Sequence, residues 1–258
     1  FYAEEVYTID YKNSITLKVL SLEQCYYKVL YQAFNKESLE VLNNNFEDVS
    51  ALKNTSPDYG IGKFLHIKKR KDLLLQRLIQ SEHNDLITEY VTLVKSGNYN
   101  QQHITEINTV AAKLYNFLKS NNSPIIKEFT NINDYLVKSY WLIGSDSWSF
   151  DLGNSGVHNL LAGSANLNLL IIDSKVKSDT SVVNSIGQRK KDVGLYAMNF
   201  GGAYVASVAA YASYTHLISS IAEAAEFNGP SIVLAYLPYQ TESASPLQIL
   251  KDTKIGVE

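Results

Sequence analysis

The sequence predicts an α/β protein built on a doubly wound parallel sheet, with a helical insertion around residues 60–139. Short apolar runs at residues 141–143 and 167–172 have the length and the branched side chains of buried parallel strands. Each run ends in a polar turn. Segments with helical periodicity alternate with such runs, as expected when helices cover both faces of a parallel sheet.

The beginning of the chain is predicted to hold a strand, a helix and a long connection. Residues 15–19 form the expected strand, and Ser21 with Gln24 makes a capping box that opens the helix. The apolar face of this helix consists of Leu22, Cys25, Tyr26, Val29, Leu30 and Ala33. Residues 35–59 are rich in Asn and weakly patterned, so we expect a connection with a turn at Ser56-Pro57-Asp58.

Residues 60–139 show helical periodicity, with breaks at residues 96–98 and 120–124. The apolar stripes are Phe64, Ile67, Leu74, Leu75, Leu78 and Ile79, then Leu86, Tyr90, Leu93 and Val94, then Ile104, Ile107, Val110, Ala111, Leu114 and Leu118. We expect a helical subregion that precedes the core sheet of residues 140–258.

The last third of the chain returns to the alternating pattern. A polar segment at residues 184–192 precedes an apolar run at 203–210, a helix at 213–227 and a last buried strand at 231–236. Asn228-Gly229-Pro230 is typical of a helix ending. Four residues are predicted to lie on central strands buried on both faces: Ile171, Val205, Val208 and Val233.

Composition narrows the functional classes. The 258 residues are 45% hydrophobic with a net charge of −3, which gives no reason to expect nucleic acid as a partner. The single Cys25 excludes a disulfide framework and a cluster held by this chain's own thiolates. No apolar run approaches membrane-spanning length, and neither a signal-peptide pattern nor an initiator Met begins the chain. We expect one cytoplasmic domain over residues 1–258, a piece of a longer polypeptide.

Polar turns follow two of the expected strands and form the candidate site. Residues 144–146 follow the first run and residues 173–180 follow the second. Ligands of open α/β sheets bind at such carboxyl ends of strands.

These turns resemble the thiamine-diphosphate-binding domain of pyruvate:ferredoxin oxidoreductases. That family has Gly-Asp-Gly-Trp where this chain has Ser145-Asp146-Ser147-Trp148, and Asp-Thr-x-Val where it has Asp173-Ser174-Lys175-Val176. Further matches in the same order are Glu23-Gln24-Cys25-Tyr26-Tyr27-Lys28, Asn45-Phe46-Glu47-Asp48, Tyr59-Gly60-Ile61-Gly62, Lys190-Lys191-Asp192-Val193-Gly194, and the runs 204–209 and 229–236. The resemblance implies the thiamine-diphosphate-binding fold.

The resemblance also implies which residues occupy the cofactor positions. The magnesium ligands would be Asp146, the Ser174 hydroxyl and the Val176 carbonyl. Asp179 replaces an Asn beside the expected phosphates and adds a negative charge there. Ser145, Ser147, Ser181 and Val182 replace the glycines that let backbone N–H groups approach the diphosphate. We therefore expect these positions to be vestigial, with no cofactor, no metal and no catalytic residue in this segment.

The family's iron–sulfur cysteines are also missing, for example at Lys18-Val19-Leu20-Ser21-Leu22, where a Cys-x-x-Cys stands in the family. Such a decayed copy resembles the corresponding region of fungal assimilatory sulfite reductase β subunits. That resemblance implies a parent oxidoreductase of methionine and cysteine biosynthesis, which reduces sulfite to sulfide with NADPH, FAD, FMN, an iron–sulfur cluster and sirohaem. The partners would be other domains of the same polypeptide and a flavoprotein α subunit.

The expected function is a non-catalytic scaffold, docked through loops near residues 148–156 and 238–243. Two alternatives stay open: a working thiamine-dependent 2-oxoacid:ferredoxin oxidoreductase domain, and an unrelated nucleotide-binding α/β domain. Other motifs are weaker. The basic run Lys68-Lys69-Arg70-Lys71 is expected to be a solvated helix face. The five histidines show no metal-ligand spacing.

Overall fold

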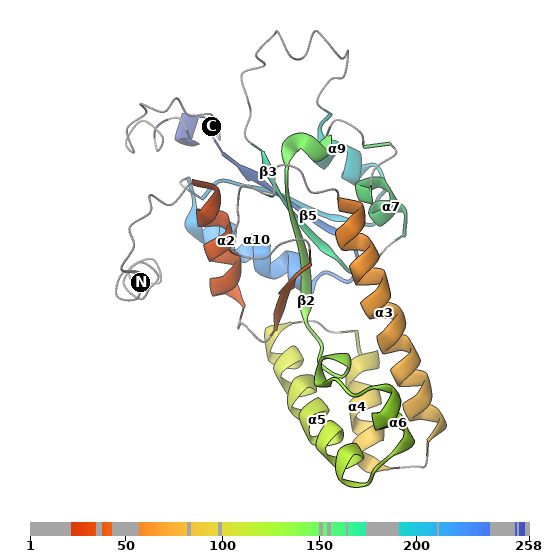
Figure 1. Ribbon diagram of the computed structural model, residues 1–258. Coiled ribbons are helices and arrows are strands. Elements are labelled where there is room, and N and C mark those ends of the chain that lie inside the picture. The colour runs from red at the N-terminus through yellow and green to blue at the C-terminus, as the bar shows by residue number, and fades with distance from the viewer. Residues whose placement is uncertain are drawn as a thin grey trace.

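A computed structural model describes most of the chain (Figure 1). The described residues are 22–34, 38–42, 57–81, 84–97, 100–149, 152–153, 156–163, 165–173, 191–210, 212–237, 251 and 253–255. The strand expected at residues 15–19 and the capping residue Ser21 lie outside them.

The described chain forms one five-stranded sheet in which every pairing is parallel. Across the sheet the strands are β1 (Leu39–Val41), β2 (Ser139–Ser145), β3 (Asn168–Asp173), β5 (Ser231–Tyr236) and β4 (Tyr204–Val208). The predicted parallel sheet is confirmed, and β5 agrees with its predicted bounds residue for residue.

Helices cover both faces of the sheet (Figure 1). One face carries α2 (Leu22–Ala33) and α10 (Tyr214–Glu226), and the other carries α7 (Gly156–Gly163), α9 (Val193–Met198) and the start of α3 (Pro57–Gln80). Side chains alternate along each strand. In β2, Trp141 and Ile143 belong to the apolar cluster on the face covered by α2 and α10, and Leu142 belongs to the cluster on the face covered by α7. Burial on both faces explains why the strands are continuous apolar runs.

The predicted helical insertion forms a third apolar cluster beyond the amino ends of the strands (Figure 1). Its helices are α4 (Asp85–Lys95), α5 (Gln101–Ser120), α6 (Pro124–Glu128) and the 3₁₀ turn η2 (Ile132–Asp134), packed against the second half of α3. Asn84, Asn100 and Ser123 cap the helices through their side chains. In the described part of the chain, no helix combines the length and apolarity needed to cross a membrane.

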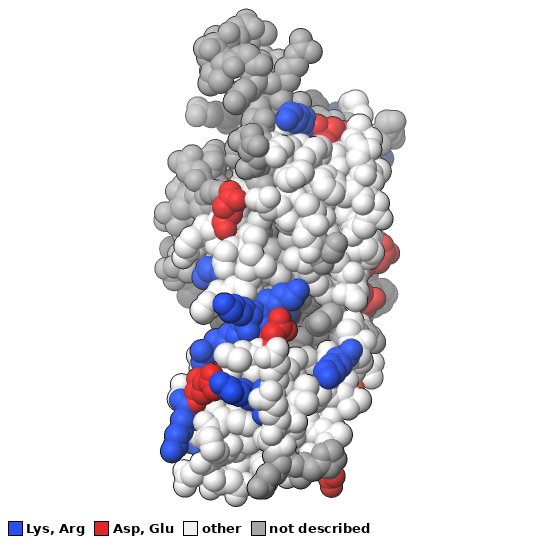
Figure 2. Space-filling view, turned by 90° about the vertical axis from the view of Figure 1, so that its right-hand side faces the viewer, with Lys and Arg blue, Asp and Glu red and all other residues white. Residues whose placement is uncertain are grey.

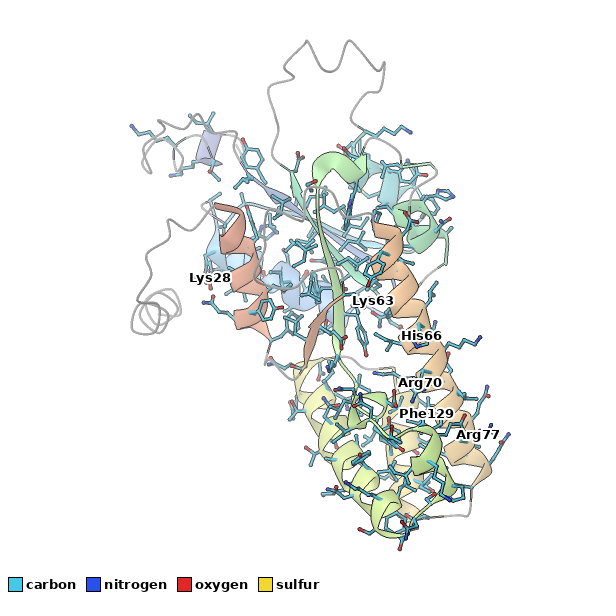
Figure 3. The ribbon with its side chains drawn as sticks, in the orientation of Figure 1. Lys28, Lys63, His66, Arg70, Arg77 and Phe129 are labelled. Carbon is cyan, nitrogen blue, oxygen red and sulfur yellow. The ribbon has the colours of Figure 1, made fainter. Side chains whose placement is uncertain are left out.

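Arg70 holds the end of this unit against α3 (Figure 3). Its guanidinium donates to both carboxylate oxygens of Asp134, at 2.6 and 2.8 Å, and to the Glu128 carbonyl at 3.1 Å. The same group lies 5.1 Å from the centroid of the Phe129 ring. Arg70 is therefore a bidentate, stacked contact between α3 and η2.

Three elements differ from the prediction. Strand β1 lies inside the segment expected to be a connection, because three residues are too few to show a period. Pro57 and Asp58, expected in a turn with Ser56, instead begin α3, where Pro57 takes a position at which helices tolerate proline, and Ser56 lies outside the described residues. Helix α9 was not predicted, although its N-cap Asp192, whose side chain accepts from Leu195 N at 2.9 Å, was a usable signal.

Several burial predictions are also wrong. Val205 and Val208 were predicted to be on a central strand, but both lie on β4, an edge strand among the described residues, and Val205 is half-buried. Ile79 is 52% exposed rather than part of the apolar stripe. The basic run is not a uniformly solvated face: Arg70 pairs with Asp134, and Lys71 donates to the Leu136 carbonyl and to Tyr140 Oη.

Candidate functional site

The carboxyl ends of three neighbouring strands meet at one edge of the sheet. Ser145 of β2 pairs with Ile172 of β3, and Asp173 at the end of β3 pairs with Tyr236 of β5. The two polar turns singled out in the sequence therefore begin side by side, as predicted for parallel strands.

Of the four predicted cofactor positions, the structure places one. Asp146 is the first residue of the 3₁₀ turn η3 (Asp146–Ser149), which follows β2 without a gap. Ser174, Val176 and Asp179 lie outside the described residues, directly after Asp173. The vestigial cofactor assignment of these four residues stays a prediction.

Trp148 of η3 has a structural role at this edge. Its side chain is 5% exposed and belongs to the apolar cluster between the sheet and α7. The indole lies so close to Gly144 of β2 that a Cβ added there would meet three ring atoms at 2.4–2.5 Å. The expectation that Trp148 lies on a docking surface is therefore wrong, because the ring fills the core of its own domain.

The next described segment, which begins at Lys191, lies at the same edge. The Lys191 N–H donates to the Ser149 carbonyl at 3.2 Å, and Asp192 then caps α9. Gly194 packs against β5, where a Cβ would lie 3.0 Å from Leu234. In the family-like run 190–194, Asp192 and Gly194 thus serve the fold.

Tyr26 is a residue of this edge that sequence reasoning placed only on a helix face. Its hydroxyl donates to the Tyr236 carbonyl and accepts from Ala210 N at 3.1 Å, so it ties α2 to the ends of β4 and β5. The ring is 1% exposed. Its place in the family-like run Glu23-Gln24-Cys25-Tyr26-Tyr27-Lys28 was the signal that could have found it.

The described residues at this edge offer few side-chain donors. No group of three or more His, Cys, Asp or Glu side chains gathers anywhere among the described residues. In that part of the chain the edge offers the Asp173 carboxylate, backbone groups and hydroxyls. The whole sequence has one cysteine, so its own thiolates cannot ligate an iron–sulfur cluster.

Comparison with known proteins shows what the chain resembles. No family model matches it. The β subunit of the NADPH sulfite reductase of Saccharomyces cerevisiae is 40% identical over 99% of this chain, and that of Schizosaccharomyces pombe is 35% identical over 92%. This chain is homologous to fungal sulfite reductase β subunits. It spans only 18% and 17% of the lengths of these two relatives.

The second expected resemblance is also confirmed. The pyruvate:ferredoxin oxidoreductase of Moorella thermoacetica is 27% identical over 81% of this chain, which spans 20% of that protein. The same α/β domain is therefore related to both kinds of oxidoreductase. Because its sulfite reductase relatives are named as subunits, they work with at least one other chain.

Proposed function

We propose that this chain is a non-catalytic docking domain of an NADPH-dependent sulfite reductase. The parent enzyme would carry electrons from NADPH through FAD and FMN of a flavoprotein α subunit to an iron–sulfur cluster and sirohaem, where sulfite becomes sulfide. None of these centres would lie in this domain, and its neighbours would be other domains of the same polypeptide.

The observation that carries the proposal is a contrast between two groups of positions that match the pyruvate:ferredoxin oxidoreductases. Residues that the fold needs are kept, as the packed Trp148, the cap Asp192 and the buried Tyr26 illustrate. Residues that the chemistry needs are missing: the cluster cysteines are absent, and Ser145 and Ser147 stand where glycines would cradle a diphosphate. Because function depends on the residues of the site and not on the fold alone, a retained fold without those residues supports a non-catalytic role.

A surface suited to docking supports the second half of the proposal. On α9 and the turn after it, Leu195 is 60% exposed, Met198 58% and Phe200 37%; we call these three residues the α9 patch. Among the described residues, few charged side chains lie on the upper part of the face shown in Figure 2, whereas Lys and Arg gather at mid-height. Apolar side chains grouped in this way mark interaction surfaces.

Titration with thiamine diphosphate and magnesium tests the non-catalytic half. We expect no binding at micromolar cofactor, because Cβ atoms replace glycines and Asp179 adds charge at the diphosphate position. The Asp146→Ala variant is the matched control, since Asp146 is the expected metal ligand. Micromolar affinity in the natural chain that disappears in Asp146→Ala would disprove the proposal.

One alternative keeps support from a specific observation. The similarity to the Moorella thermoacetica protein favours a thiamine-dependent 2-oxoacid:ferredoxin oxidoreductase domain, and the same titration decides between the two. An unrelated nucleotide-binding domain has no such support, because the comparisons match both families along most of the chain.

A further inference from the structure

A cavity of about 240 Å³ lies at the opposite end of the sheet from the polar edge. Its walls include Ser139 and Asn168, the first residues of β2 and β3, and Asn228, which precedes β5. Further walls come from α3, α4 and α5, from residues 137–140 and 166, and from Ala225 of α10, so the cavity lies where the helical unit meets the sheet. It is therefore separate from the position of a cofactor at the carboxyl ends.

The cavity has an apolar wall and a basic one. Phe64, Ile67 and Leu75 of α3 line it together with residues of α4 and α5, as in sites for small organic molecules. The charged residues in the lining are Lys68, Lys71, Asp72 and Lys138. Figure 2 shows the gathering of basic side chains at mid-height on the face that α3 crosses.

The charges leave a surplus of one positive charge. The charge of Lys138 is already balanced, because its Nζ lies 3.1 Å from a carboxylate oxygen of Glu40, a residue that does not line the cavity. Lys68 and Lys71 carry two positive charges and Asp72 carries one negative charge, so one positive charge remains unbalanced. A single negative charge on a ligand would balance the cavity.

Lys71 is the most enclosed of these groups. Its ammonium donates to the Leu136 carbonyl and, at 2.7 Å, to Tyr140 Oη. Burial, and second the repulsion of Lys138, lower the pKa of Lys71 to about 8, although Glu40 and Asp134 oppose the shift. An anion in the cavity would supply the missing counter-charge.

Asn168 forms part of the cavity wall on the side of the sheet. The residue is 2% exposed, and its Nδ2 donates to the Tyr140 carbonyl at 3.2 Å. Among the described residues, its Oδ1 is a buried side-chain oxygen with no hydrogen-bond donor. A carboxylate has no hydrogen to donate, so this buried oxygen belongs to the wall and is not a contact for an anion.

We propose that this cavity binds a small organic monocarboxylate, whose carboxylate pairs with Lys71 and Lys68 while its apolar body packs on the wall formed by α3 and α4. A volume of about 240 Å³ exceeds what an inorganic oxyanion needs, and the apolar wall would not suit one. The proposal does not depend on the docking role, because the cavity and the α9 patch share no residue.

Calorimetric titration of the chain with benzoate tests the site, with benzyl alcohol as the neutral probe of similar shape. We expect benzoate to bind at millimolar concentration and benzyl alcohol to bind at least about tenfold more weakly. Lys71→Met and Lys68→Met each keep an apolar stem and remove the charge, and each is expected to weaken benzoate binding about tenfold. Lys69→Met is the matched control, because Lys69 is exposed on the same helix and does not line the cavity.

The pH dependence gives a readout that a merely structural lysine would not change. Lys71 faces Lys68 and Asp72 on its own helix, and Tyr140, Lys138, Glu40 and Asp134 on the elements packed against it. Between about pH 7 and pH 9, benzoate affinity should fall in the natural chain and stay level in Lys71→Arg, which remains protonated. Equal binding of the two probes, equal effects of Lys71→Met and Lys69→Met, or no benzoate binding at millimolar concentration would each overturn the proposal.

Discussion

Gly144 and Trp148 show at the scale of single residues how this domain keeps its fold. The ring of Trp148 occupies the space that a side chain at Gly144 would need. The glycine therefore permits close packing in the middle of a buried strand, although glycine is unfavourable there for its conformational entropy.

Replacing Gly144 with Ala should destabilise the domain. The new Cβ would lie 2.4 Å from indole carbons whose ring cannot bend away, so the core must expand. Such overpacking costs about 1–3 kcal/mol, which denaturant unfolding can measure. Gly153→Ala is the control, because a Cβ at Gly153 meets nothing within 4 Å. Equal unfolding free energies for the two variants would show that Trp148 is not packed against Gly144.

At the scale of elements, the sheet separates central positions from edge positions. Ile171 of β3 is 1% exposed and lies between β2 and β5, whereas Val205 lies on β4, which has a neighbour on one side among the described strands. Truncation at the two positions removes very different amounts of buried apolar surface.

Ile171→Ala should cost roughly 2–4 kcal/mol of unfolding free energy, the range for emptying a well-packed core position. Val205→Ala should cost about 1 kcal/mol, because its side chain is already half in water. Urea or guanidinium unfolding of both variants measures the difference. A cost for Val205→Ala as large as that for Ile171→Ala would mean that β4 is covered by a further element.

The sequence predicted most elements that carry a long period. The apolar stripes of α4 and α5 and the strands β2, β3 and β5 were found because their patterns extend over enough residues to be distinctive. Strand β1 and helix α9 are three and six residues long, so they show no period and depend on tertiary contacts. Strand order is likewise a property of the assembled sheet, which is why Val205 was predicted to be central.

The sequence predicted where the candidate site lies better than it predicted which side chains pack around it. The two polar turns begin side by side at the carboxyl edge, since parallel strands bring their ends together. The burial of Trp148 and the contacts of Tyr26 depend on packing partners that lie in distant segments, so no local pattern revealed them. Lys71 was assigned to a solvated run for the same reason.

At the scale of the whole molecule, α3 joins two units that do different work. Its first half packs under the sheet with α7, and its second half forms the core of the helical unit. The chain spans under a fifth of the length of its sulfite reductase relatives, so most of each relative lies outside the matched region. The three side chains of the α9 patch are apolar and exposed, so a neighbouring domain could pack against them.

The most direct test places charges on the α9 patch in the full-length parent enzyme, as Leu195→Glu with Met198→Glu. Both side chains are more than half exposed, so the domain itself should still fold. The control is Thr215→Glu with Ala222→Glu, at exposed positions of α10 on the other face of the sheet.

The measurement is subunit assembly together with sulfite reduction driven by NADPH and by an artificial donor that feeds the sirohaem directly. The docking role predicts that assembly and NADPH-driven reduction fall together by about tenfold or more in the α9 variant, as for central interface residues. Reduction from the artificial donor should persist, and the α10 control should behave like the natural enzyme. Unchanged assembly and NADPH-driven activity in the α9 variant would contradict the docking role.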